Sequence, residues 1–181
     1  MIRMTAPSFR RSSEAGFTLI ELLVTLAIMV LLVGGAVAAY VNYDNQQKVF
    51  QAGSNFASVV RTAQKRATVG DKTSACPGKL MGYEVKANAN AQSYTMAMVC
   101  DVAGVQGPYG TVTYALPSST MSFQSGVSIS FAALSGGFPY TISSASQDVC
   151  IGDSNSSNYY KMTIYRTGAI QTPTAVAANC L

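Results

Sequence analysis

The chain has 181 residues, only 11% of them charged, and it contains no His and no Trp. Because His is the commonest general base and a common metal ligand, Ser-His-Asp and Cys-His catalysis and His-bearing zinc sites are excluded. Clustered acids and the Asp-Thr/Ser-Gly and Gly-x-Ser-x-Gly motifs are also missing, so the sequence does not indicate an enzyme. Soluble domains are roughly 25% charged. The low charge therefore indicates a chain that enters a membrane or packs against copies of itself.

The net charge of +4 is shared equally between a short N-terminal segment and the rest of the chain. Residues 1–16 contain Arg3, Arg10 and Arg11 against Glu14, which gives +2 and leaves +2 for all remaining residues. Nucleic-acid-binding domains usually carry a denser basic footprint. The composition therefore gives little support to nucleic acid as the main partner.

An apolar segment of 25 residues with one charge follows, from Phe17 to Val41. As a helix with a rise of ~1.5 Å per residue, it is long enough to cross a hydrocarbon core of ~30 Å. Three arginines precede it, and only Asp44 and Lys48 follow closely. By the positive-inside rule, residues 1–16 stay in the cytoplasm and the chain after about Val41 is exported.

A cleaved secretory signal peptide is the main alternative, because Ala36-Val37-Ala38 has the form of an A-x-A cleavage site. Two features count against it. The apolar run from Phe17 to Val33 exceeds the usual length of roughly 7–15 residues, and it contains Glu21. A carboxylate in a membrane helix usually signals a partner. Position alone leaves open whether Glu21 has one or only reaches the headgroups.

The residues around Glu21 favour a partner for its carboxylate over simple contact with the headgroups. The run Ala15-Gly16-Phe17-Thr18-Leu19-Ile20-Glu21, after a basic leader, resembles the processing signal of the type IV pilin and pseudopilin superfamily. The resemblance implies that a prepilin peptidase cuts after Gly16 and methylates the new terminus on Phe17. It also implies that Glu21 neutralises that amine, in the same chain or in a neighbouring subunit. Because an unpaired buried charge costs several kcal/mol, Glu21 would set the register of assembly.

The same resemblance implies the partners and the location. The partners are the prepilin peptidase, other pilin or pseudopilin subunits, the inner-membrane assembly platform, and membrane lipid before assembly, with no cofactor. The domains expected are a cytoplasmic leader at 1–16, a transmembrane and fibre-core helix at 17–41, and an exported domain at 42–181. The protein would begin as a single-pass protein of the cytoplasmic membrane and end in an extracellular or periplasmic fibre.

The helix is expected to continue far beyond the membrane. Small and apolar residues recur at spacings of three and four, which is typical of a helix face against a core: Val49, Gly53, Phe56, Val60, Ala63 and Ala67. The sequence predicts one helix from about Phe17 to Thr68, with Gly70-Asp71 as its stop signal. Four basic residues lie largely off this face, and a solvated helix surface explains them better than a DNA-binding patch: Arg61, Lys65, Arg66 and Lys72.

One departure from the family pattern concerns proline. Many members carry one in or just after the apolar half, but this chain has none between Pro7 and Pro77. Gly34-Gly35 could allow bending there, since each Gly weakens a helix by about 1 kcal/mol. Close packing of a neighbouring helix against these small residues explains the pair equally well.

After residue 78 the apolar period changes from 3.6 to 2. Five short runs rich in Val, Ile, Tyr and Thr predict strands: Leu80–Lys86, Ser93–Asp101, Thr111–Leu116, Val127–Ala133 and Tyr159–Tyr165. Turns are predicted between them at 88–90, 104–107, 117–118, 135–137 and 167–168, the last joining hairpin arms 161–165 and 169–172. The fold class expected is α+β, with the long helix packed against one antiparallel sheet, as in pilins.

Within the superfamily the closest resemblance is to the H-type minor pseudopilins and related fimbrial-biogenesis minor pilins. Three stretches carry it: the helix end Ser58–Thr68, the run Gly82–Val85, and the closing run Ile164–Ile170. It implies a structural subunit, and it leaves the choice between a pilus and a type II secretion or competence system open. A membrane-anchored binding domain that never polymerises remains the rival outside the superfamily.

Four cysteines lie in the part expected to be exported: Cys76, Cys100, Cys150 and Cys180. Their spacings do not match a zinc ribbon, and an oxidising compartment favours two disulfides over free buried thiols. Of the three connectivities, we favour 76–100, which would tie the helix end to the second strand. The second disulfide would then be 150–180, and the loop that it closes resembles the C-terminal disulfide region of many type IV pilins.

The polar run Asp153–Ser157 alternates oxygen-bearing side chains, and certain pseudopilins bind calcium in a C-terminal loop. The run lacks the Gly and the distal Glu of an EF-hand loop. A polar loop tip without metal is therefore the better interpretation. Asn155-Ser156-Ser157 is also a formal glycosylation sequon, an equally weak signal.

Overall fold

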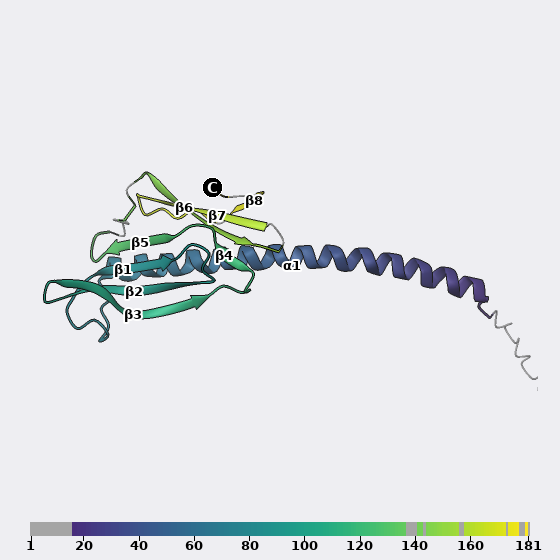
Figure 1. Ribbon diagram of the computed structural model, residues 1–181, viewed down its shortest axis with the longest axis horizontal. Coiled ribbons are helices and arrows are strands. Elements are labelled where there is room, and N and C mark those ends of the chain that lie inside the picture. The colour runs from purple at the N-terminus through teal and green to yellow at the C-terminus, as the bar shows by residue number, and fades with distance from the viewer. Residues whose placement is uncertain are drawn as a thin grey trace, which may run out of the picture. The chain divides into compact units, whose positions relative to one another are not determined.

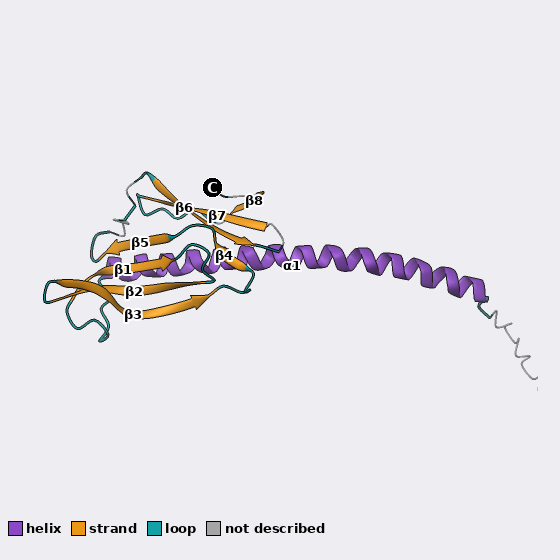
Figure 2. Ribbon diagram, in the orientation of Figure 1, coloured by secondary structure: helices purple, strands orange, loops and turns teal. Residues whose placement is uncertain are grey.

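The computed structural model describes residues 16–136, 141–142, 144–155, 158–172, 174–177 and 180. The chain forms two compact units, Met1–Tyr40 and Val41–Leu181. The helix α1 (Leu19–Val69) begins in the first unit and ends in the second, and strands follow it in the second unit (Figures 1 and 2). The predicted long helix is confirmed, beginning two residues later and ending one residue later than expected.

The buried face of α1 in the second unit is the predicted one. Val49, Phe56, Val60, Ala63 and Ala67 are fully buried, and the apolar face also takes in neighbouring alanines. The basic residues expected off this face are exposed. The spacing of three and four residues alone therefore identified the helix face that meets the core.

The end of α1 has a local cause. Gly70 adopts φ +67°, its N–H donates to the Ala67 carbonyl at 3.1 Å, and the Asp71 N–H donates to the Arg66 carbonyl at 2.9 Å. This is the Schellman pattern, which needs a left-handed residue after the helix. A Cβ at Gly70 would also lie 3.0 Å from a methyl carbon of Leu134, so two constraints favour glycine there.

The strands of the second unit are β1 (Lys79–Ala87), β2 (Ser93–Val102), β3 (Val105–Ala115), β4 (Met121–Phe123), β5 (Val127–Ala132), β6 (Ser146–Asp153), β7 (Asn158–Tyr165) and β8 (Thr174–Ala177). The described strands form two antiparallel four-stranded sheets, ordered β3-β2-β1-β5 and β4-β6-β7-β8. The α+β class is confirmed, whereas the expectation of one sheet is wrong.

Phe56 of α1 shows why two sheets are compatible with one helix. Its ring meets Tyr94 of β2 at a centroid distance of 5.0 Å and Phe123 of β4 at 5.2 Å, both edge to face. Both sheets therefore pack on the second half of α1 and share one apolar core. The helix serves as the common spine of the two sheets.

Three strands had no counterpart in the prediction, namely β4, β6 and β8, and β3 begins earlier than expected. The predicted turn at 104–107 is in fact a two-residue turn with positive φ at Ala103 (55°) and Gly104 (86°), which suits a tight hairpin. Residues 105–107 therefore belong to β3. In the last hairpin only one bridge, Ile164–Ile170, joins the predicted arms. The strands that pair with β7 are β6 on one side and β8 on the other.

Candidate processing and assembly site

The helix begins at a capping contact. The Thr18 hydroxyl oxygen accepts a hydrogen bond from the Glu21 backbone N–H at 3.3 Å, and the Thr18 carbonyl accepts from the Leu22 N–H at 3.2 Å. Thr18 is thus the N-cap and Glu21 the third helical residue, the spacing of a capping box. The sequence signal for this role is the pattern Thr-x-x-Glu before an apolar run, a capping motif that the predicted processing signal overlaps.

Gly16 and Phe17 lie just before the helix, in exposed backbone with no regular structure. The Phe17 side chain is 81% exposed. A peptidase needs an accessible peptide bond, and both residues of the bond between Gly16 and Phe17 are exposed. Residues 1–15 of the expected leader lie outside the described residues.

Glu21 is exposed and lies in the first turn of α1. A carboxylate there interacts favourably with the positive end of the helix dipole. Phe17, whose nitrogen would become the new amine, lies four residues before it. The described residues place no other acidic group in the first turn, so Glu21 is the acid available there to a cation at this end.

The apolar part of the first unit is exposed along its length. Every large apolar side chain described between Leu19 and Tyr40 has more than half of its surface exposed. By length and composition, α1 contains one segment apolar enough to cross a membrane. Exposed apolar surface of this extent needs cover, from lipid or from other apolar helices.

The helix continues through Gly34 and Gly35. A Cβ placed at either glycine would meet no atom within 4 Å. The helix is continuous here, and the space beside both glycines is open. Both interpretations of the pair, a site for close packing of another helix and a site for bending, are compatible with this.

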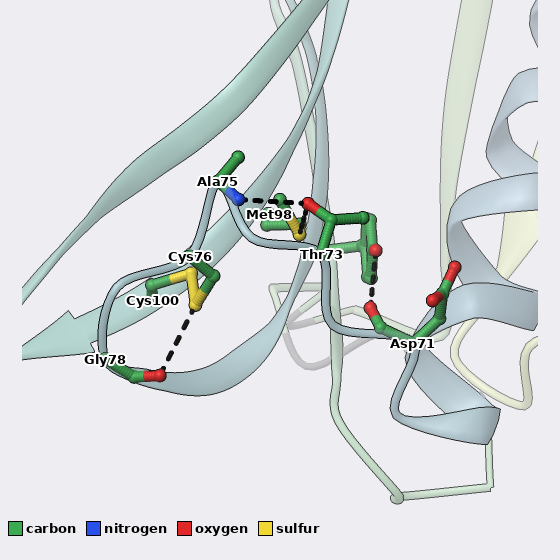
Figure 3. The surroundings of a disulfide bond; sticks show 8 residues. Asp71, Thr73, Ala75, Cys76, Gly78, Met98 and Cys100 are labelled. Carbon is green, nitrogen blue, oxygen red and sulfur yellow. Dashed lines mark hydrogen bonds between the residues drawn. A yellow bond between two sulfur atoms is a disulfide. The ribbon is translucent and has the colours of Figure 1, made fainter.

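The structure contains the disulfides Cys76–Cys100 and Cys150–Cys180, with Cα–Cα distances of 5.9 and 5.7 Å. Figure 3 shows that the first joins the loop after α1 to β2, next to Thr73 and Met98. In the same loop the Asp71 carbonyl accepts a hydrogen bond of 2.6 Å from the Tyr83 hydroxyl. The loop that follows the helix is therefore held to β1 and β2 by covalent and polar contacts.

The basic residues near the helix end do not form one free surface. The Arg66 guanidinium lies 3.8 Å from the Asp71 carboxylate, and Arg61 donates to the Ile170 carbonyl at 3.5 Å. Lys65 and Lys72 are exposed. This arrangement accords with a solvated helix flank.

The polar run 153–157 begins with a buried acid, the last residue of β6. Asp153 is 3% exposed, and its carboxylate accepts a hydrogen bond from the Asn155 N–H at 3.2 Å. Residues 156–157, which complete the polar run and the sequon, lie outside the described residues. Among the described residues no group of three or more His, Cys, Asp or Glu could hold a metal ion.

Burial and polar contacts shift a few ionisable groups of the second unit. Burial, with a contribution from the neighbouring Tyr114, raises the pKa of Tyr94 to about 12. The hydrogen bond from Lys161 at 2.7 Å, followed by one from Thr163, lowers the pKa of Asp148. These groups stabilise the fold and lie on elements remote in sequence from Gly16, Phe17 and Glu21.

Comparison with known proteins gives one match. A family model described as the prokaryotic N-terminal methylation motif matches residues 11–37. No curated protein and no solved structure matches the chain. The matched range contains the Gly16–Phe17 bond and Glu21. The match supports a type IV pilin-like protein that is processed as a prepilin and assembles with other pilin subunits, and it indicates a structural protein.

Proposed function

We propose that the chain is a structural subunit, a minor pilin, of a type IV pilus-like fibre. The prepilin peptidase cuts it after Gly16 and methylates Phe17, and it then assembles through the apolar part of α1. The observation that carries the proposal is the methylation-motif match at residues 11–37 on a helix whose apolar side chains are exposed.

The proposed domains are the leader at 1–16, the membrane and fibre-core helix at 17–41, and the exported domain at 42–181. The boundary between the two compact units lies beside Val41. In the membrane, lipid covers the apolar side chains of 17–41. In the fibre, the corresponding helices of other subunits replace the lipid, because apolar surface needs cover in both places.

Glu21 is proposed to set the register of assembly. Cleavage creates a cationic amine on Phe17, which must be neutralised in an apolar environment. The exposed carboxylate of Glu21 is the acid that the first turn of α1 offers. A subunit inserted in the wrong register leaves both charges unpaired, which costs several kcal/mol and rejects it.

The direct test is mass spectrometry of the N-terminus of the exported protein. We expect N-methylated Phe17 as the first residue. A terminus near Ala39 would indicate a cleaved secretory signal and overturn the proposal. An intact Met1 would overturn it as well, and would favour a membrane-anchored domain that does not polymerise.

A second candidate is an H-type pseudopilin of a type II secretion or competence system. Two of the three stretches that resemble this group contact each other, since Gln64 of α1 donates to the Gly168 carbonyl at 2.9 Å. Mechanical shearing of cells distinguishes the candidates. A pilus subunit appears in the sheared extracellular fraction, whereas a pseudopilin stays with the cell and its deletion blocks secretion or DNA uptake.

A further inference from the structure

A groove runs between α1 and the end of β3 in the second unit. It has a volume of about 290 Å³. The residues that line it come from α1, β2 and β3: Asn55, Ser58, Val59, Tyr94, Tyr114 and Ala115. All six lie in the second unit and are among the described residues. The groove is therefore a feature of the second unit alone.

Two tyrosines form the aromatic wall of this groove. Tyr94 and Tyr114 are directly opposite each other in the β2–β3 ladder, and their rings stack at a centroid distance of 5.2 Å and an interplanar angle of 15°. Tyr94 is 3% exposed, and its ring also meets Phe56 and Phe123 edge to face. Tyr114 is only partly buried. The core therefore fixes Tyr94, and Tyr94 in turn braces the more exposed ring of Tyr114.

The Tyr94 hydroxyl has no partner within the chain. Although the side chain is buried, its hydroxyl makes no hydrogen bond to any group in the part of the chain that the structure describes. A buried tyrosine usually places its O–H against a hydrogen-bond partner. Because Tyr94 lines the groove, the partner can come from a molecule bound there. Water can take this role, and a ligand hydroxyl can replace it.

The opposite wall of the groove carries neutral hydrogen-bonding side chains. Asn55 and Ser58 are exposed and lie three residues apart on α1, so they are neighbours on one helix face. Neither side chain makes a hydrogen bond to another described residue. A carboxamide donates through nitrogen and accepts through oxygen, and a hydroxyl does both. This wall therefore offers both donors and acceptors without charge.

The lining selects the chemical class of the ligand. None of the six described lining residues is charged, so an ionic ligand would find no opposite charge in the groove. A purely apolar ligand would leave the polar groups of Asn55, Ser58 and Tyr94 without partners, which costs free energy. A sugar meets both requirements. Its hydroxyls donate and accept, and the C–H groups on one face of a pyranose ring can pack on an aromatic ring, whose face carries partial negative charge.

We infer that this groove binds a neutral saccharide, with one sugar ring packed against Tyr114 and its hydroxyls hydrogen-bonded to Asn55, Ser58 and Tyr94. Ligand sites usually have volumes of roughly 300–1,000 Å³, so the groove suits a single unit of a glycan. The inference goes beyond the proposed function, because it adds a binding activity to the exported domain. It holds whether or not the chain polymerises.

A proline-rich peptide is the other kind of ligand that packs on tyrosines. Such peptides dock in grooves lined by aromatic residues, whereas this groove has a single partly exposed ring, that of Tyr114. Proline also has no N–H, so its backbone offers only carbonyl oxygens to Asn55 and Ser58. The mixture of donors and acceptors in the lining therefore favours a saccharide.

Saturation-transfer NMR on the full chain tests the inference, in micelles of a detergent that has no sugar headgroup. The probes are lactose, maltotriose and diacetylchitobiose as neutral saccharides, sialyllactose as the charged counterpart of lactose, and a polyproline peptide. We expect transfer to at least one neutral saccharide, strongest at the C–H protons on one face of one ring. Transfer to none of the neutral saccharides overturns the inference, and so does transfer only to sialyllactose or only to the peptide.

Variants of the lining place the bound saccharide in this groove. Asn55→Ala and Ser58→Ala each remove one hydrogen-bonding group from the exposed helix surface and should weaken binding about three- to tenfold. Tyr114→Ala should weaken it about tenfold or more, and Tyr114→Phe, which keeps the ring, should retain more binding than Tyr114→Ala. Tyr165→Ala is the matched control, because Tyr165 is 41% exposed on β7 and does not line the groove.

Thermal unfolding and complete disulfide formation show whether each variant folds. Because Asn55 and Ser58 are exposed, their variants keep the test decisive even if Tyr114→Ala unfolds the domain. Natural affinity in both folded helix variants overturns the inference, and so does an equal loss of binding in Tyr165→Ala. The N-terminal mass of the exported protein decides the proposed function separately, so the two can fail independently.

Discussion

The backbone N–H of Glu21 donates to the hydroxyl of Thr18 at 3.3 Å, so the acid proposed to set the register of assembly also belongs to the cap of the helix. The two roles depend on different atoms. The capping contact shown uses the Glu21 backbone, whereas neutralisation of the Phe17 amine needs the Glu21 carboxylate. Substitutions can therefore separate them.

Glu21→Gln and Glu21→Ala should both be processed normally but enter fibres at least about tenfold less often than the natural chain. Each removes the charge that neutralises the Phe17 amine, and an unpaired buried charge costs several kcal/mol. Gln is a good residue at this capping position, so helix formation is preserved in that variant. Fibre content is measured by immunoblot of sheared material, and processing by the N-terminal mass.

Thr18→Ala is the matched control, because it removes the capping hydroxyl and keeps the Glu21 carboxylate. It should weaken the start of the helix by about 1 kcal/mol and leave much of the incorporation intact. Faster amide hydrogen exchange at residues 19–22 in detergent micelles would report the loss of the cap. If Thr18→Ala lowers fibre content as much as Glu21→Gln does, the register role of the carboxylate is wrong.

Replacing Cys76 and Cys100 together by Ser should lower the free energy of unfolding by about 3 kcal/mol. The same replacement of Cys150 and Cys180 should have a similar effect, because the two bonds close loops of similar length, with separations of 24 and 30 residues. Thermal unfolding of the full chain in detergent measures both. Unchanged unfolding temperatures would show that the bonds do not stabilise the exported domain.

Phe56→Ala should destabilise the second unit by about 3–5 kcal/mol, because its fully buried ring contacts Tyr94 and Phe123 on two different sheets. Phe50→Ala removes a ring that is 44% exposed and should cost only about 1 kcal/mol. Denaturant unfolding of the two variants gives the comparison. Equal losses would contradict the placement of Phe56 as the link between the sheets.

Stability should fall at alkaline pH partly because of Tyr94. Burial raises its pKa to about 12 in the folded chain, against 10.0 for the unperturbed group. Below pH 10 both states are neutral and stability is unaffected. Between pH 10 and 12 the unfolded state releases a proton that the folded state retains, so stability falls. Tyr94→Phe should therefore lose less stability than the natural chain between pH 10 and 12, measured by denaturant midpoints. Parallel curves for both proteins would contradict this.

The elements that the sequence predicted well depend on residues close together in the chain. The helix face needs only the spacing of residues such as Phe56 and Val60, and the helix end needs only Gly70. The strands β1, β2, β5 and β7 carry enough period-2 pattern to be recognised within a residue or two. The short strand β4 has three residues and shows no such pattern, because it becomes a strand only by pairing with Ile151–Asp153 of β6.

The sequence by itself determined the N-terminal motif, the apolar segment and the spine helix, because a processing motif and a helical period are written in consecutive or regularly spaced residues. Tertiary structure decided the division into two sheets, the Phe56 contacts between them, and the hydrogen bonds of Thr141 along the outer edge of β5. These features depend on which distant segments pair and which edges the chain covers itself, as Thr141 does at β5. Segments that are distant in the sequence pack into one shared core around α1, so no local sequence pattern predicts these features.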